Sequence, residues 1–250
     1  MSVRERFAHL LIDTAGRLAG APDEDTRWQV ITDICGSLGA TSVNSAGFVE
    51  RGGQMAWMRS TIPRSWMEEY HESGLGDVDA ILAMARRGRL PAVLDMRRLP
   101  SFGRDAVRRT QLDALREGSG MRYCLAATSS SGGLRRMLAI TTSDDPRDIF
   151  GKGAARAFAT IGTLLSMQLS APRVGDTADL FGGTAPRPAE EDLRILRAMA
   201  GGRGLLAVSA GLGMGPGDLR LRLREICAKL QVSTHEEALE MAQARGLLQA

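Results

Sequence analysis

Residues 171–188, with the sequence APRVGDTADLFGGTAPRP, mark a boundary between two candidate domains. The segment combines three prolines with three glycines and has no sustained helical or strand period, which is typical of a linker. The chain has 250 residues, 44% of them hydrophobic, so it can build a core on each side. We predict a domain over residues 1–170, a linker over 171–187 and a second domain over 188–250.

The first part of the chain mixes helical and strand-like patterns. Length, β-branched content and flanking glycines predict strands over residues 42–49, 53–59, 122–129 and 136–142. Apolar spacing predicts helices over 7–18, 26–38, 65–87, 104–117 and 152–170. This order of elements predicts an α+β domain, in which helices flank one mixed sheet.

The second part, residues 188–250, predicts four short helices. Pro188 is suited to begin the first helix, and glycines from Gly201 onward end it. Gly213 separates a second short helix from a third that begins at Pro216. The fourth helix begins at Ser233 or Thr234, each followed three residues later by a glutamate. The apolar stripe of the third helix consists of Leu219, Leu223, Ile226 and Leu230, spaced 4-3-4.

Cations flank the stripe of this third helix. At 100° per residue, Arg220 and Arg224 project on one side and Arg222 and Lys229 on the other. One interpretation is that the helix enters a DNA major groove, where these four side chains meet phosphates and base edges. The other is a small helical bundle with a solvated charged face. The net charge of the chain, +3, is too small to decide between them.

The second part resembles the DNA-binding domain of LuxR-type quorum-sensing regulators. The residues that carry the resemblance are Ile195, Leu196, Gly202, Leu212, Gly213, Leu219, Lys229, Leu230, Val232, Ala238, Gly246, Leu247 and Leu248. The resemblance implies a helix-turn-helix that binds double-stranded DNA as a dimer. The family's DNA-contact pattern is not kept, because Gly215, Asp218, Arg222 and Glu225 replace its serine, threonine, histidine and asparagine. Asp218 places a carboxylate where phosphates would approach, which opposes binding.

The first part resembles the autoinducer-binding domain of the same family through the spacing of Pro63, Trp66, Tyr70 and Asp79. The resemblance implies a site for an acyl-homoserine lactone. Trp66 would donate its indole N–H to the lactone carbonyl, Asp79 would accept the amide N–H, and Tyr70 would line the wall. The residues alone also allow a structural interpretation, in which Trp66 and Tyr70 pack and Asp79 caps a helix that starts near Ala80.

Departures from the family pattern in this region are concentrated at ligand-facing positions. They are Ile62 for a tyrosine, Ala80 for a proline, Leu94 for a tryptophan, Cys124 for a glycine, Thr128 for a proline and Ala139 for a small hydroxylated residue. The expected pocket is therefore more apolar. A long-chain or chemically different acyl ligand fits this composition, and so does the absence of any ligand.

Other classes of function find little support in the sequence. The cysteines Cys35, Cys124 and Cys227 lack metal or redox spacing and favour a reducing compartment. No signal peptide and no apolar stretch of about 20 residues is present, so we expect a cytoplasmic protein. The histidines His9, His71 and His235 lie in separate segments, and no catalytic motif accompanies them. We expect no enzyme activity, no metal and no cofactor.

Two functional hypotheses remain open. The first is a ligand-responsive transcription regulator that senses an acyl-homoserine lactone or a related acyl signal and binds promoter DNA as a homodimer. The second is a partner or inhibitor of another regulator, acting through mixed dimers and either independent of ligand or impaired in DNA binding. Asp218 and Glu225, on the helix that would contact DNA, favour the second hypothesis.

Overall fold

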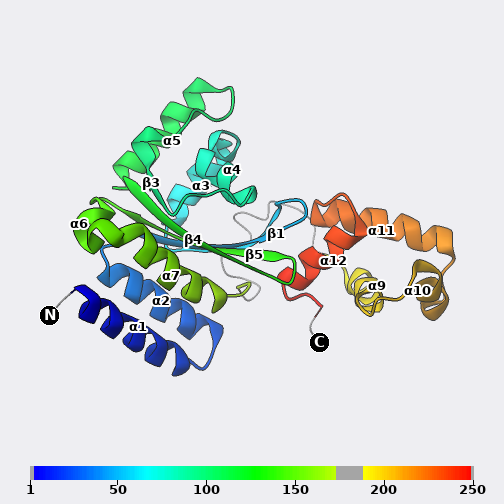
Figure 1. The fold of residues 1–250 in the computed structure, drawn as a ribbon. Helices are drawn as coiled ribbons and strands as arrows, with labels where there is room; N and C mark the ends of the chain where they lie inside the picture. The colour runs from blue at the N-terminus through cyan, green and yellow to red at the C-terminus, as the bar shows by residue number, and fades with distance from the viewer. Residues whose placement is uncertain (1–2, 173–187, 249–250) are drawn as a thin grey trace.

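The computed structural model describes residues 3–172 and 188–248, which form an α+β domain and a helical domain (Figure 1). Most of the predicted linker, residues 173–187, lies outside the described residues. The strands of the first domain are β1 (Ser42–Val49), β2 (Met55–Ser60), β3 (Val93–Asp95), β4 (Tyr123–Ser131) and β5 (Leu134–Thr142). Its helices are α1 (Val3–Ala19), α2 (Glu24–Ser37), α3 (Arg64–Glu72), α4 (Ala80–Arg86), α5 (Ala106–Gly118), α6 (Pro146–Phe150) and α7 (Ala154–Met167). Short 3-10 turns are η1 (Leu75–Val78), η2 (Met96–Arg98) and η3 (Gly151–Gly153).

The five strands form one sheet in the order β2-β1-β5-β4-β3. The α+β class is confirmed, but every strand pair is antiparallel, so the expectation of a mixed sheet is wrong. The physical reason lies in the connections, because β1–β2 and β4–β5 are hairpins and β5 returns beside β1 in the opposite direction. Gly132 and Gly133 form the second hairpin turn with φ of 61° and 76°, the left-handed pair that a type I′ turn requires.

Helices cover both faces of the sheet, with α1, α2 and α7 on one side and α3, α4 and α5 on the other (Figure 1). β1 is therefore buried along its whole length. Gly47 leaves room on this strand for the ring of Trp57 on β2, since a Cβ at position 47 would lie 2.4 Å from Trp57 Nε1. Both faces of the sheet are thus buried, and one of them borders the cavity described below.

The predicted helical stretch 65–87 is broken into α3, η1 and α4. Gly74 follows α3 with φ of 61°, in the left-handed region that ends a helix readily. Asp79 then caps α4, where its side chain accepts hydrogen bonds from the N–H groups of Ile81 and Leu82. This break turns α3 and α4 toward each other and brings Tyr70 within hydrogen-bond distance of Asp79.

The helices of the second domain are α9 (Glu190–Ala200), α10 (Leu205–Leu212), α11 (Pro216–Leu230) and α12 (His235–Ala244). The first of them begins two residues after Pro188, where the Asp192 carboxylate accepts a hydrogen bond from the Ala189 N–H. Thr234 caps α12 and forms a capping box with Glu237, which confirms the second of the two predicted starts. The predicted apolar stripe of α11 is buried throughout.

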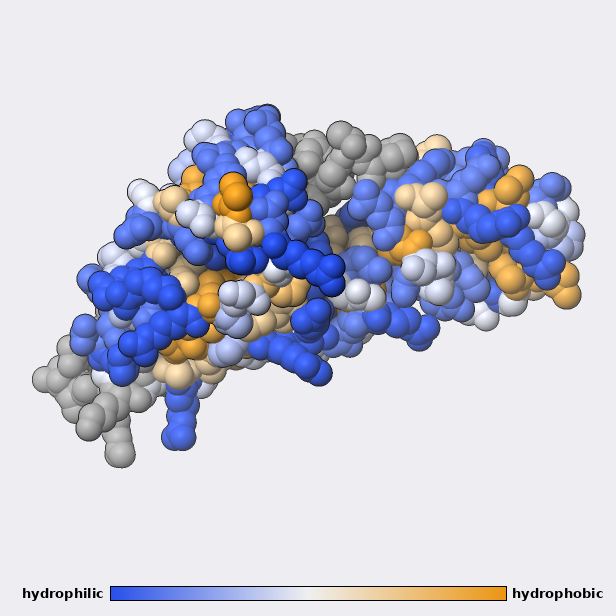
Figure 2. Space-filling view, turned by 90° about the horizontal axis from the view of Figure 1, so that it is seen from above, coloured by the Kyte–Doolittle hydropathy of each residue, from blue (hydrophilic) through white to orange (hydrophobic). Residues whose placement is uncertain are grey.

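The second domain contacts the first through α12, which lies against β1 and β2. Arg245 Nε donates a hydrogen bond to the Ala56 carbonyl at 2.9 Å, and Arg51 forms an ion pair of 3.7 Å with Glu240. The α10–α11 pair lies at the far end of the molecule (Figure 1). Apolar side chains reach the surface at that end (Figure 2), where Leu206 and Leu221 are exposed. The face that the sequence assigns to DNA is therefore not covered by the first domain.

Candidate ligand cavity and DNA-binding face

A cavity of about 110 Å³ lies between the sheet and the helices α3 and α4. The three predicted ligand residues, Trp66, Tyr70 and Asp79, all line it. Much of the remaining wall is apolar and comes from β1, β2, β4, β5 and the helices above them. These residues include Ala46, Phe48, Met55, Met58, Ile62, Ile81, Leu82, Cys124, Met137 and Ala139. The sequence thus identified three side chains that the fold brings to one cavity.

Asp79 is the most highly bonded side chain of this cavity. Its Oδ1 accepts hydrogen bonds from the Ile81 and Leu82 N–H groups at 2.8 and 3.2 Å. The same oxygen accepts one from Arg116 Nη2 at 2.7 Å, and Oδ2 accepts one from the Tyr70 hydroxyl at 2.9 Å. Each carboxylate oxygen offers about two lone-pair sites, so Oδ1 is fully used and Oδ2 retains one site. Asp79 caps α4, as the structural interpretation expects, and it also lines the cavity, while its contact with a ligand stays a prediction.

Trp66 and Tyr70 form one stacked pair on α3, with ring centroids 5.4 Å apart and an interplanar angle of 16°. Burial raises the pKa of the Tyr70 hydroxyl far above its ordinary value, and the Asp79 carboxylate adds to the shift. Tyr70 is therefore a permanent donor to Asp79. Trp66 Nε1 donates to the Leu115 carbonyl at 3.3 Å, longer than a typical N–H···O bond. The indole N–H is held loosely and can turn to a better acceptor.

Arg116 is a site residue that the sequence interpretation missed. It lies on α5 and is 6% exposed, and its guanidinium pairs with the Asp79 carboxylate. A sequence signal was present, because Arg116 follows the buried Leu112 by four residues and so lies on the inner face of the helix. A buried carboxylate such as Asp79 also requires a cation nearby. The pairing crosses 37 residues of sequence, which local spacing does not reveal.

Three of the residues that depart from the family pattern line the cavity, and their side chains make its wall apolar, as the sequence predicts. Ile62, Cys124 and Ala139 are on the wall. Burial raises the pKa of the Cys124 thiol to about 12, so this side chain is uncharged at neutral pH. Leu94 packs on the same apolar cluster, whereas Thr128 is exposed and away from it.

The four cations assigned to DNA contact fall into two pairs on α11. Arg222 forms ion pairs with Glu191 of α9 at 2.5 Å and with Glu225 at 2.9 Å. Lys229 Nζ lies 2.6 Å from Asp192 Oδ2, whose side chain is fully buried. These two cations therefore stabilise the contact between α9 and α11.

Arg220 and Arg224 form the other pair, and both are exposed on α11. Within residues 188–248, no ion pair or hydrogen bond holds either side chain. Gly215 caps α11 without a side-chain hydrogen bond, and Asp218 is exposed in the first turn. The open face of α11 therefore presents two free guanidinium groups and one carboxylate.

No cluster of three or more potential metal-ligating side chains occurs in the described parts of the chain. Among the helices of residues 3–172 and 188–248, none combines the length and apolar character needed to cross a membrane. The cysteines Cys35, Cys124 and Cys227 are buried and free.

The fold and the site define a two-part chain, in which a domain with an internal cavity is joined to a helix-turn-helix domain. The structure is similar to the crystal structure of CepR2 from Burkholderia cenocepacia, an N-acylhomoserine lactone dependent LuxR family transcription factor. The TM-score is 0.51 at 20% sequence identity, over 65% of this chain and 93% of that one. The covered part of the chain therefore has the fold of that structure.

Weaker similarities extend along nearly the whole chain. Escherichia coli SdiA gives a TM-score of 0.46 at 11% identity, over 100% of both chains. SdiA in complex with octanoyl-rac-glycerol gives 0.44 at 11% identity, over 98% of this chain and 97% of that one. No protein-family model and no curated protein sequence matches the chain.

Proposed function

We propose that this protein is a ligand-responsive transcription regulator of the LuxR type. It binds an acyl-homoserine lactone or a related acyl signal and recognises promoter DNA as a homodimer in the cytoplasm. The observation that carries the proposal is the occurrence in one chain of two features: a cavity walled by Trp66, Tyr70 and Asp79, and a helix-turn-helix that exposes Arg220 and Arg224. The fold shared with CepR2, an acylhomoserine lactone dependent factor, supports it.

Ligand binding requires the cavity to enlarge. Its volume of about 110 Å³ is below the range of about 300–1,000 Å³ that is common for ligand pockets. The loose Trp66–Leu115 hydrogen bond and the methionines on the wall make such a change accessible, because methionine adapts its shape easily. A ligand that binds only the folded protein then stabilises it by mass action. Response to the signal is therefore an increase in the amount of stable, dimer-forming protein.

We expect protein produced in cells supplied with long-chain acyl-homoserine lactones to carry one, detected by mass spectrometry after denaturation. Trp66→Phe keeps the ring but removes the indole N–H, so the retained ligand should fall several-fold, the effect of one lost neutral hydrogen bond. Trp28→Phe, on α2 and away from the cavity wall, is the matched control and should retain the ligand. Finding no bound acyl compound, with equal solubility in supplied and unsupplied cultures, contradicts this part of the proposal.

DNA recognition is assigned to the open face of α11. In a dimer, two such helices reach half-sites one helical turn apart, about 34 Å along the duplex. Arg220 and Arg224 carry no internal ion pair within residues 188–248, so binding a phosphate breaks no contact of the protein. Arg222 and Lys229, by contrast, would have to leave acidic partners first. The first two side chains are therefore the expected DNA contacts.

We expect the double variant Arg220→Glu/Arg224→Glu to weaken DNA binding by at least about tenfold in a fluorescence anisotropy assay. Two lost phosphate contacts per protomer should also reduce the slope of log K against log salt by about 1.8 for each protomer. Arg64→Glu, a reversal at an exposed arginine of α3, is the control and should leave both quantities unchanged. Unaltered binding by the double variant across a salt titration would remove these residues from the interface.

A second candidate function rests on the acidic residues around α11. Glu191, Asp192 and Glu225 neutralise Arg222 and Lys229, and Asp218 adds a free carboxylate to the first turn. A chain of this kind acts as a partner or inhibitor of another regulator through mixed dimers. Selection of purified protein against random duplex oligonucleotides separates the two functions. Enrichment of a palindromic site supports the regulator, and no enrichment supports the partner.

A further inference from the structure

A second cavity adjoins the first on the same side of the sheet. It has a volume of about 620 Å³, within the usual range for ligand pockets, and lies between α5, the segment after η2 and the start of β4. Three residues, Met96, Arg116 and Met121, line both cavities and form the wall between them. Movement of two flexible methionines at this wall would join the two spaces into one.

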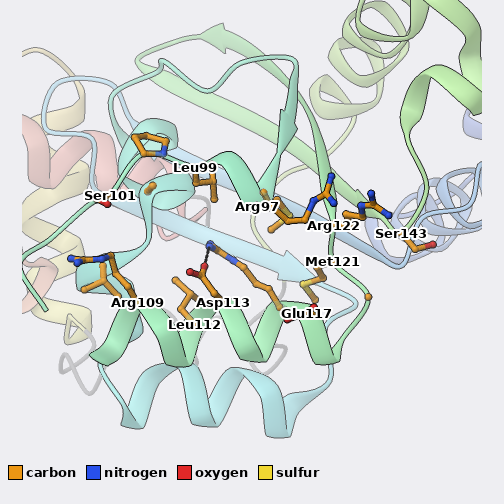
Figure 3. A pocket seen from close by; sticks show the side chains of 16 residues that line it. Arg97, Leu99, Ser101, Arg109, Leu112, Asp113, Glu117, Met121, Arg122 and Ser143 are labelled. Atoms are coloured by element: carbon orange, nitrogen blue, oxygen red, sulfur yellow. Dashed lines mark ion pairs between the residues drawn. The ribbon is translucent and has the colours of Figure 1, made fainter. Parts of the chain in front are cut away.

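The larger cavity carries more cations than anions. Figure 3 shows Arg109, Asp113 and Glu117 on α5, with Arg97 and Arg122 near each other across the cavity from this helix. Together with Arg116, four arginines face two carboxylates. Arg122 lies 5.4 Å from the centroid of the Tyr123 ring and forms no ion pair with the described residues.

Arg116 has hydrogen-bond donors that the protein does not use. Its Nη2 donates to Asp79, but its Nη1 lies 4.0 Å from Asp113 Oδ1, too far for a hydrogen bond. No described group accepts from Nη1 or Nε, although the side chain is only 8% exposed. A guanidinium has five N–H donors and no acceptor, and none of the Arg116 nitrogens is among the fully buried unpaired atoms of the described residues. The unused donors are therefore open to a ligand that brings acceptors.

The acceptor capacity of Asp79, in contrast, is largely used. It accepts three hydrogen bonds at Oδ1 and one at Oδ2, so one lone-pair site remains, on Oδ2. A head group that must donate therefore finds a single free acceptor site on this carboxylate. A head group that only accepts meets the unused donors of Arg116 and the unpaired guanidinium of Arg122 directly. Carboxylate is such a group, and it matches the planar fork of arginine.

We propose that the ligand of this protein is an amphipathic carboxylate, a fatty acid or an acyl chain ending in a carboxylate, whose head group lies in the larger cavity against Arg116 and Arg122. Its tail follows Leu99, Leu112 and Met121 and passes the shared wall into the small apolar cavity. This inference deepens the proposed function and rests on it, because it names the chemical class of the sensed molecule.

Isothermal titration calorimetry of the full chain tests the inference with three probes of equal chain length: decanoate, decanol and decanoyl-homoserine lactone. We expect decanoate to bind at least about tenfold more tightly than decanol, since hydrogen bonds to charged groups are stronger than neutral ones. The affinity for decanoate should also fall as salt is added, because its head group is recognised by charge. Equal affinities for decanoate and decanol overturn the inference.

Two variants locate the head group without disturbing the Asp79 pair. Arg122→Gln should weaken decanoate binding by about tenfold and leave decanol unchanged. Arg98→Gln is the matched control, an exposed arginine of η2 that does not line the cavity, and should bind decanoate like the parent. Equal decanoate affinity in both variants overturns the placement of the head group.

The outcomes separate this inference from the proposed function. If decanoyl-homoserine lactone binds more tightly than decanoate, the carboxylate inference is wrong while the ligand-responsive function stands. If none of the three probes binds, the carboxylate inference and the proposed response to an acyl ligand are both wrong. Decanoate binding that depends on Arg122 supports both.

Discussion

Replacing Arg116 with methionine is expected to lower the free energy of unfolding of the first domain by about 3–5 kcal/mol, the loss typical when a buried ion pair is left with one partner. Arg116 and Asp79 are 6% and 8% exposed, so water can replace the guanidinium only in part. Three hydrogen bonds to Asp79 remain in the variant, which favours the lower end of this range. Urea unfolding followed by tryptophan fluorescence measures the loss, because Trp28, Trp57 and Trp66 all lie in this domain.

The double variant Asp79→Asn/Arg116→Met tests whether this loss comes from the uncompensated charge of Asp79. An asparagine at position 79 can still cap α4, and it leaves no buried charge. The double variant should therefore be more stable than Arg116→Met alone, which a double-mutant cycle records as a coupling between the two side chains. If the two substitutions simply add, the pair contributes no stabilising interaction and the assignment of Arg116 as the counter-ion of Asp79 is wrong.

Much of the fold could be predicted because its longer elements carry their own signals. β1, β4 and β5 are eight or nine residues long and are bounded by turn residues, and Gly132–Gly133 identifies a hairpin directly. β3 has three residues, too few to show a strand pattern. Its place at the sheet edge comes from pairing with β4, a contact between distant segments that local pattern cannot reveal.

The candidate ligand site could be predicted in part. The resemblance carried by Trp66, Tyr70 and Asp79 implied a common pocket, and the fold brings all three to one cavity. Their bonding was not predictable, since it depends on the turn of the chain at Gly74 and on a cation from α5. Arg116 supplies that cation, and only the packing of α5 over the sheet places it there.

Helical geometry predicted two flanks on α11 but could not say which flank faces the rest of the domain. Arg222 and Lys229 share one flank, and the packing of α9 against it converts both into partners of acidic side chains. The sequence predicts the same role for Arg220 and Arg224, but these two side chains form no ion pair within residues 188–248. A charge on an amphipathic helix therefore becomes a candidate DNA contact only once its neighbours are known.

Lys229→Met is expected to lower the stability of the second domain by about 1–3 kcal/mol, because it leaves the buried Asp192 carboxylate without its cation. Far-UV circular dichroism is the measurement, since this domain contains no tryptophan or tyrosine. Arg222→Met is the matched control. Its acidic partners are largely exposed, so the change should be at most about 1 kcal/mol.

The pH dependence of the Lys229→Met effect identifies its cause. Burial alone raises the pKa of Asp192, but hydrogen bonds from Lys229 and the Ala189 N–H outweigh it and hold the pKa below its usual range. A carboxyl whose pKa is lowered on folding adds stability above its unfolded pKa, about 3.9, and loses it as the pH falls through the folded value. The difference between parent and variant should be full at neutral pH and shrink below about pH 4. A difference that does not change with pH would mean that Lys229 acts through packing of its alkyl chain and not through its charge.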